Sequence, residues 1–170
     1  MEHSTKKLGM MFTTAGWLLA FVLLTLGFDR LIDWQSNPNR SVATAETGSY
    51  QEIVLQRNRM GHYVFDGEIN RQTVTFLVDT GATTTAIPAH LQDSLGLRAG
   101  PATTVSTANG NTTAYLTRLD QLAIGEIELS DVGASIIEGM GVEEVLLGMN
   151  VLKHFELVQR GDQLIIRHYR

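Results

Sequence analysis

The 170-residue sequence contains no cysteine, only three prolines and no evident internal repeat. Without cysteine the chain has no disulfide, which is compatible with an exported domain that does not rely on disulfides. Basic residues are also scarce: from Gln51 to Arg170 there are 9 Lys and Arg against 14 Asp and Glu, a net charge of −5. A nucleic-acid ligand requires a basic face, so the sequence predicts no nucleic-acid partner.

The sequence also lacks the signatures of two common kinds of active site. Its histidines at positions 62, 90, 154 and 168 fall on different predicted elements and show no metal-ligand spacing. No elbow motif supports a Ser/His nucleophile. We therefore predict neither a metal site nor a cofactor.

Near the N-terminus, a run of 21 residues from Leu8 to Phe28 (8–28) carries no charge. As a helix it would be about 31 Å long, close to the thickness of the bilayer hydrocarbon. Lys6 and Lys7 precede it, so the positive-inside rule predicts a transmembrane helix with residues 1–7 in the cytoplasm and the rest of the chain outside. A cleaved signal is the alternative, but its apolar region is usually about 7 to 15 residues long. The nearest small-x-small site, Ala43-Thr44-Ala45, lies well downstream.

After the apolar run, residues 29–49 are polar and show no persistent apolar period, which favours a linker. Residues 50–170 predict a mostly β domain, because β-branched and aromatic residues alternate with polar ones between turn signals. The expected strands are Glu52–Arg57, Gly61–Ile69, Gln72–Val78, Ala102–Thr107, Asn111–Leu122, Ile127–Ile137 and the buried run Val145–Leu147.

Two short helices and a final hairpin complete the prediction. Pro88 at a first helical turn and Gly96 just past an end indicate a helix from Pro88 to about Leu95. Asn150 can cap a second helix that reaches Phe155. A hairpin turning at Gly161-Asp162 brings in Gln163–Arg167, which we expect to be a covered edge or a surface that pairs with another subunit.

The most informative motif is Asp79-Thr80-Gly81-Ala82-Thr83, which directly follows the apolar run Val74–Val78. This order places one carboxylate on a tight turn at the end of a buried strand. An isolated Asp-Thr-Gly is more often an ordinary turn. In an aspartic protease, however, two carboxylates share one proton, and one activates water while the other donates to the scissile carbonyl. The motif occurs once, so a second Asp79 must come from a second copy across a two-fold axis.

Several further segments accompany the acid motif in the expected order: Gly61-His62, Asp66–Asn70, Phe76–Thr83, Thr107–Gly110 and Leu147–Met149. With them the chain from about Glu52 to Arg170 resembles the retropepsin-like aspartic proteases, and in particular the membrane-anchored bacterial members. The resemblance implies an all-β acid protease barrel with one or two short helices and one lobe per chain, preceded by the single transmembrane helix.

The resemblance also implies roles for particular residues. Asp79 would be the catalytic acid, Thr80 would bond across the two-fold axis, and Gly81 would let the substrate backbone approach. Ala82 and Thr83 would contact substrate. The flap would consist of Ala108, Asn109 and Gly110, and the strand that supports the acid loop would contribute Leu146, Leu147 and Gly148.

Two positions depart from the retroviral pattern. Retroviral members usually carry Asp where this chain has Thr83 and Arg where it has Met149, and those two residues form an ion pair near the dimer interface. Here both positions are neutral. Losing both partners together leaves no orphaned buried charge, so the change is compatible with folding.

These observations predict a membrane-anchored, homodimeric aspartic endopeptidase of the cell inner membrane, with its protease domain on the periplasmic or extracytoplasmic side and extended peptide as substrate. The alternative is a non-catalytic peptide-binding or assembly module that uses the same fold and groove. A third possibility is an enzyme that cuts only itself, between Asp29 and Gly48.

Overall fold

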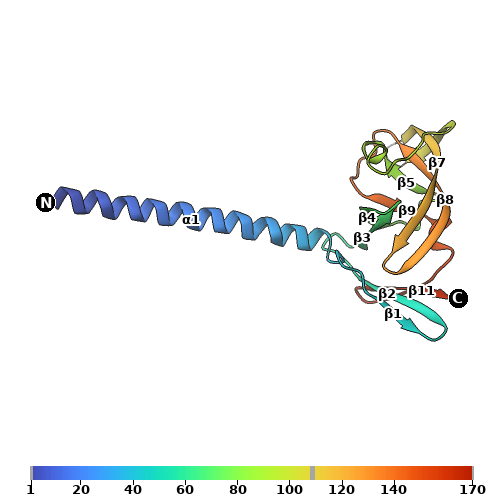
Figure 1. Cartoon of the computed structure of the whole chain (residues 1–170), viewed down its shortest axis with the longest axis horizontal. Coiled ribbons are helices and arrows are strands. Elements are labelled where there is room, and N and C mark those ends of the chain that lie inside the picture. The colour runs from blue at the N-terminus through green and yellow to red at the C-terminus, as the bar shows by residue number, and fades with distance from the viewer. Residues whose placement is uncertain (1, 108–109, 170) are drawn as a thin grey trace. The chain divides into compact units, whose positions relative to one another are not determined.

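The computed structural model describes residues 2–107 and 110–169, and the chain divides into two compact units, Met1–Ser36 and Asn37–Arg170 (Figure 1). The elements are α1 (Glu2–Ser36), β1 (Thr44–Thr47), β2 (Tyr50–Gln56), β3 (Val64–Ile69), β4 (Gln72–Val78), β5 (Thr85–Pro88), the 3₁₀ helix η1 (Ala89–Leu91), β6 (Ala102–Thr107), β7 (Gly110–Ile124), β8 (Ile127–Ile137), β9 (Val145–Leu147), α2 (Met149–Leu152), β10 (Glu156–Arg160) and β11 (Gln163–Tyr169).

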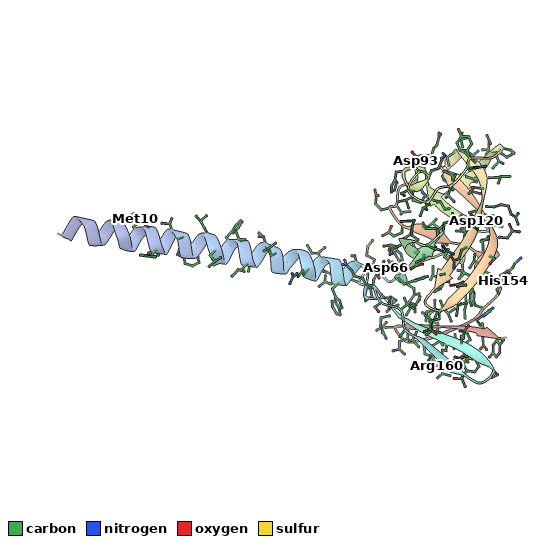
Figure 2. All side chains as sticks on the ribbon, in the orientation of Figure 1. Met10, Asp66, Asp93, Asp120, His154 and Arg160 are labelled. Carbon is green, nitrogen blue, oxygen red and sulfur yellow. The ribbon has the colours of Figure 1, made fainter. Side chains whose placement is uncertain are left out.

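The first unit is the single helix α1, in which Gly9–Phe28 is long and apolar enough to cross a membrane, with a mean hydropathy of 1.8. The apolar side chains of this stretch are exposed, as Figure 2 shows, and Met10 is 71% exposed. The helix continues past the expected end at Phe28 as far as Ser36. Pro38 explains the end, because proline disfavours the helical conformation of the residue before it and has no N–H to donate.

The second unit begins inside residues 29–49, the segment predicted to be a linker, and this segment contains regular structure: the end of α1 and all of β1. Asn39 is buried, and its Nδ2 donates to the carbonyl oxygens of Gln56 (2.9 Å) and Val64 (2.7 Å). Its Oδ1 accepts from the Gln56 N–H at 2.7 Å. Further on, β1 pairs with β2. The polar residues are therefore bonded to strands that come later in the chain.

A four-stranded sheet has the order β1-β2-β11-β10. Ile166 pairs with Ile53 and Leu164 with Leu55, and all four side chains are buried in the core. The expectation that the last strand is an edge is wrong, because β11 lies between β2 and β10. In the described part of the chain, β1 and β10 end this sheet.

The other sheet has the order β3-β4-β9-β5-β8-β7-β6, and a further pairing of β3 with β7 closes six of its strands into a barrel. Phe65 and Phe76 stack inside it with ring centroids 5.3 Å apart. Both rings are fully buried. The all-β acid protease fold predicted from the sequence is confirmed.

Compared with the prediction, the barrel has one additional strand and lacks one helix. Strand β5 was not expected, because its four residues are all buried and show no alternation. The predicted helix from Pro88 to Leu95 is wrong: only Ala89–Leu91 is helical, as a 3₁₀ turn. Leu95 and Leu97 are both buried on either side of Gly96, whose φ is +65°. Because both leucines are buried in the core, the chain turns at Gly96 and does not form the predicted helix.

A charged cluster covers the outer face of the four-stranded sheet. Arg167 donates to Glu52 (2.7 Å) and to Glu156 (3.2 Å), and the Tyr169 hydroxyl donates to Glu156 at 2.9 Å. The hydrogen bond from Tyr169, followed by that from Arg167, lowers the pKa of Glu156. The folded state therefore favours the ionised form of Glu156.

Because the pKa of Glu156 is lowered on folding, its contribution to stability is present above the unfolded-state pKa and is lost as the pH falls through the folded-state value. We expect Glu156→Gln to lower the melting temperature near neutral pH and to have little effect below about pH 3. Thermal unfolding across this range measures the difference. Glu128→Gln, at another exposed site, is the control. If Glu156→Gln lowers the melting temperature by the same amount at every pH, the lowered pKa of Glu156 does not contribute to stability as we expect.

Candidate active site

The turn after β4 holds the Asp79 carboxylate through main-chain groups. The Gly81 N–H donates to Asp79 Oδ1 at 2.8 Å, and the Ala82 N–H donates to the Asp79 carbonyl at 3.2 Å. Asp79 is half-buried, whereas Thr80 and Gly81 are exposed. The turn thus fixes the orientation of the carboxylate while its neighbours face away from the protein interior.

Strand β9 and helix α2 support this turn through backbone hydrogen bonds. Leu147 pairs with Val78 in parallel, and its carbonyl accepts the Asp79 N–H at 3.1 Å. The first N–H groups of α2 bind the same turn, from Met149 to the Ala82 carbonyl (2.8 Å) and from Asn150 to the Thr83 carbonyl (3.1 Å). The structure therefore brings the predicted support strand and the acid turn into direct contact.

Gly148 permits this contact. A Cβ atom at this position would lie 2.6 Å from the Thr84 carbonyl carbon, 2.7 Å from its oxygen and 2.9 Å from the Thr85 nitrogen. All three are backbone atoms, so no rotamer change can relieve the clash. Only glycine lets the two segments approach this closely.

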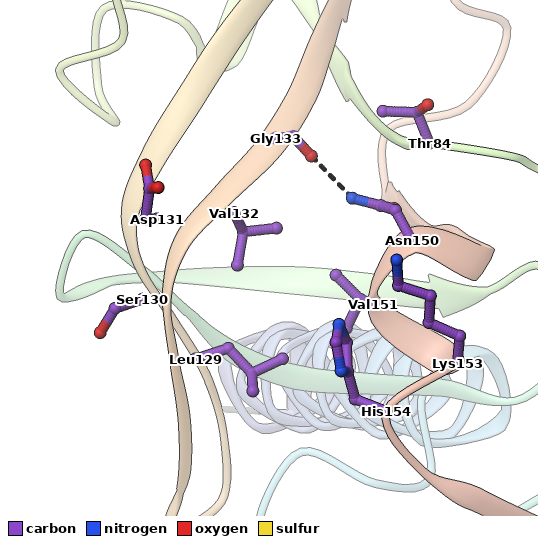
Figure 3. A pocket seen from close by; sticks show the side chains of 10 residues that line it. All are labelled: Thr84, Leu129, Ser130, Asp131, Val132, Gly133, Asn150, Val151, Lys153 and His154. Carbon is purple, nitrogen blue, oxygen red and sulfur yellow. Dashed lines mark hydrogen bonds between the residues drawn. The ribbon is translucent and has the colours of Figure 1, made fainter.

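Asn150 has a different role from the helix cap expected of it, so that prediction is wrong. Gly148 precedes the helix, which ends at Leu152 rather than Phe155. The Asn150 Oδ1 accepts from the Thr85 N–H (2.8 Å) and hydroxyl (3.1 Å), and its Nδ2 donates to the Gly133 carbonyl at 2.7 Å (Figure 3).

Of the predicted flap, Ala108 and Asn109 lie outside the described residues. Gly110 is the first residue of β7 and pairs with Thr107 at the end of β6, so these two strands form the expected hairpin. Ala82 is half-buried and Thr83 is exposed beside the acid turn. The flap and substrate-contact roles of these residues remain predictions.

No group of three or more His, Asp or Glu side chains that could hold a metal ion occurs among residues 2–107 and 110–169. The residues of the acid turn and its support offer backbone donors and one carboxylate. This composition suits acid–base chemistry.

A single Asp on a glycine turn, at the end of a barrel strand and braced by a Leu-Leu-Gly strand and a short helix, defines the retropepsin-like aspartic protease class. The chain belongs to the family described as "gag-polyprotein putative aspartyl protease", whose model matches residues 65–154.

The chain is also similar to two uncharacterized proteins and to one solved structure. The chain is 32% identical to an uncharacterized protein in the cobV 5′ region of a Sinorhizobium species over 136 residues, covering 76% of this chain but only 58% of that protein. It is 27% identical to the uncharacterized protein RP867 of Rickettsia prowazekii over 168 residues, covering 93% of this chain and 71% of that protein. A crystal structure of a retropepsin-like aspartic protease from Rickettsia conorii superposes with a TM-score of 0.57 at 27% identity, covering 75% of this chain and 94% of that chain.

We expect Gly148→Ala to destabilise the domain by about 1–3 kcal/mol or more, because the added methyl group would overlap backbone atoms of Thr84 and Thr85. Denaturant unfolding measures the loss. Gly133→Ala is the matched control, since no atom lies within 4 Å of its Cβ position and alanine fits an extended strand. Equal stability of the two variants would contradict the close-packing argument.

Proposed function

We propose that the chain is an aspartic endopeptidase that is active as a homodimer. The observation that carries this proposal is the Asp79 carboxylate, oriented by the Gly81 N–H on a turn that occurs once per chain. One carboxylate cannot serve as base and acid in the same step. A second copy, related by a two-fold axis, would supply the other.

In the proposed dimer the two Asp79 side chains share one proton. The ionised carboxylate takes a proton from a water molecule, whose oxygen attacks the carbonyl carbon of the scissile bond, while the protonated carboxyl group donates to the carbonyl oxygen. The resulting tetrahedral intermediate breaks its C–N bond as the nitrogen receives a proton from the pair. The products are one new carboxyl end and one new amino end.

The peptide would lie across the two acid turns as an added strand. Thr80, which is exposed next to Asp79, would bond to the partner's turn, and Gly81 would present no side chain to the approaching peptide backbone. Recognition would depend mainly on main-chain hydrogen bonds, with side-chain pockets supplying preference.

We further propose that α1 anchors the enzyme in the inner membrane, with residues 1–7 in the cytoplasm and the protease domain outside. The length and hydropathy of Gly9–Phe28 support a span, and Lys6 and Lys7 support this orientation. Confinement to one membrane raises the effective concentration of the domains and favours their association.

The test uses the full chain reconstituted into lipid vesicles and an unstructured peptide library, assayed between about pH 3 and pH 7. We expect cleavage whose rate per chain rises with the protein-to-lipid ratio, and we expect Asp79→Asn to reduce it at least about 100-fold, because a neutral amide cannot act as the general base. Asp93→Asn, at an exposed aspartate outside the acid turn, is the control and retains full activity.

Cleavage that persists in Asp79→Asn would contradict the assignment of the acid. A chain that binds peptides but does not cut them at any protein-to-lipid ratio would instead support the peptide-binding module. Mass spectrometry of the library after incubation distinguishes these outcomes.

A further inference from the structure

Two cavities adjoin on the outside of the barrel, on the side of α2 and β8. One, of about 480 Å³, is lined by Thr84, Gly133 and Lys153 among others (Figure 3). The other, of about 450 Å³, is also lined by Thr84 and Gly133, and its further lining includes Arg98. Because two residues belong to both linings, the cavities form one groove with Gly133 between them. We call it the β8 groove.

Packing within the chain does not explain why Gly133 is a glycine. It lies inside the 11-residue strand β8, and no atom comes within 4 Å of the position that its Cβ would occupy. Gly67 and Gly148, in contrast, each face backbone atoms closer than 3 Å. A glycine within a strand weakens it and often marks a place where a ligand or another backbone approaches closely.

An exposed ion pair, Arg118–Asp131, lies in the lining of the β8 groove. Asp131 has a φ of +57°, which is uncommon for a residue other than glycine. Arg118 donates to both carboxylate oxygens of Asp131 and, at 3.2 Å, to its backbone carbonyl.

The charge of the β8 groove is opposite to that of the domain around it. Its lining contains Arg98, Arg118 and Lys153, which are three of the nine cations from Gln51 to Arg170, but only Asp131 of the fourteen acids. The Arg118–Asp131 pair neutralises itself. Arg98 and Lys153 remain, one in each cavity, so the groove is complementary to carboxylates.

The β8 groove is also connected to the acid turn. Thr84, which lines both cavities, is the fifth residue after Asp79. Asn150 binds the Gly133 carbonyl through its side chain and the Thr83 carbonyl through its N–H. A polypeptide in the groove would thus lie close to the segment that carries the acid.

We propose that the β8 groove binds an extended acidic segment of the substrate polypeptide, outside the stretch that is cut. The segment's backbone passes over Gly133, and its carboxylate side chains enter the two cavities toward Lys153 and Arg98. This proposal rests on the proposed endopeptidase function for the identity of the bound polypeptide as substrate.

The binding test uses the full chain carrying Asp79→Asn in vesicles, so that no cleavage interferes. The probe is a fluorescent extended peptide rich in Glu, compared by anisotropy with the same peptide carrying Gln. We expect the Glu peptide to bind at least about tenfold more tightly than the Gln peptide, since each ion pair that forms adds to binding. Equal affinities would overturn the acidic specificity.

Two substitutions locate the binding. Gly133→Val fills the open space above the strand with a residue that favours β structure, so we expect unchanged stability and at least tenfold weaker binding of the Glu peptide. Lys153→Glu should weaken binding similarly, whereas Arg160→Glu, on β10 and outside the groove lining, should not. Binding that Gly133→Val leaves unchanged would overturn the proposed site.

Cleavage by the chain with an intact Asp79 tests whether the groove serves the substrate. We expect Gly133→Val to raise KM for peptides that carry an acidic segment beside the cut stretch, without changing kcat, and to leave peptides lacking that segment unaffected. If Gly133→Val leaves KM unchanged for both kinds of peptide, the proposal that the groove binds substrate is overturned. The two proposals fail separately: absence of any cleavage would remove the proposed function, while tight Glu-specific binding lost in Gly133→Val would still establish the groove as an acidic-peptide site.

Discussion

The contact between Gly148 and the backbone of Thr84 and Thr85 is the constraint on which the rest of the structure depends. It lets β9 lie between β4 and β5, parallel to the first and antiparallel to the second, and this insertion completes the ring of strands that the β3–β7 pairing closes. The same strand presents the Leu147 carbonyl to the Asp79 N–H. Barrel closure and the placement of the acid therefore arise from one packing event, so a substitution that loosens β9 alters stability and site geometry together.

The sequence predicted those elements whose determinants are local. Strands β4, β6 and β8 have their predicted bounds, because each alternates or runs apolar between clear turn residues. Long-range partners determined the features that it missed. Asn39 looks like part of a polar linker until its bonds to Gln56 and Val64 are seen, and Asn150 looks like a cap until Gly133 lies beside it. The acid motif could be found because all of its chemistry lies in five consecutive residues.

The four-stranded sheet affects how a second copy could meet the first. Strand β11 lies between β2 and β10, so both edges of the last strand are already paired within the chain. Within the described residues, the unpaired edges of this sheet are β1 and β10. Only three residues separate the end of α2 from β10, and α2 binds the acid turn directly. Strand β10, one of these edges, is thus close in sequence to the helix that binds the acid turn.

The proposed dimer would not require a strong interface. Thr83 and Met149 replace the charged pair that retroviral members place near the interface, and the backbone bonds from α2 to Ala82 and Thr83 brace the turn within one chain instead. Each chain thus holds its own half of the site in position without help from the partner.

Helix α1 ends at Ser36 and the compact unit begins at Asn37, so the proposed tether to the membrane is short. Two domains on short tethers can reach effective concentrations on the order of millimolar. Association in the membrane would then stabilise the proposed dimer in place of the missing ion pair. Activity would increase with the density of the protein in the bilayer.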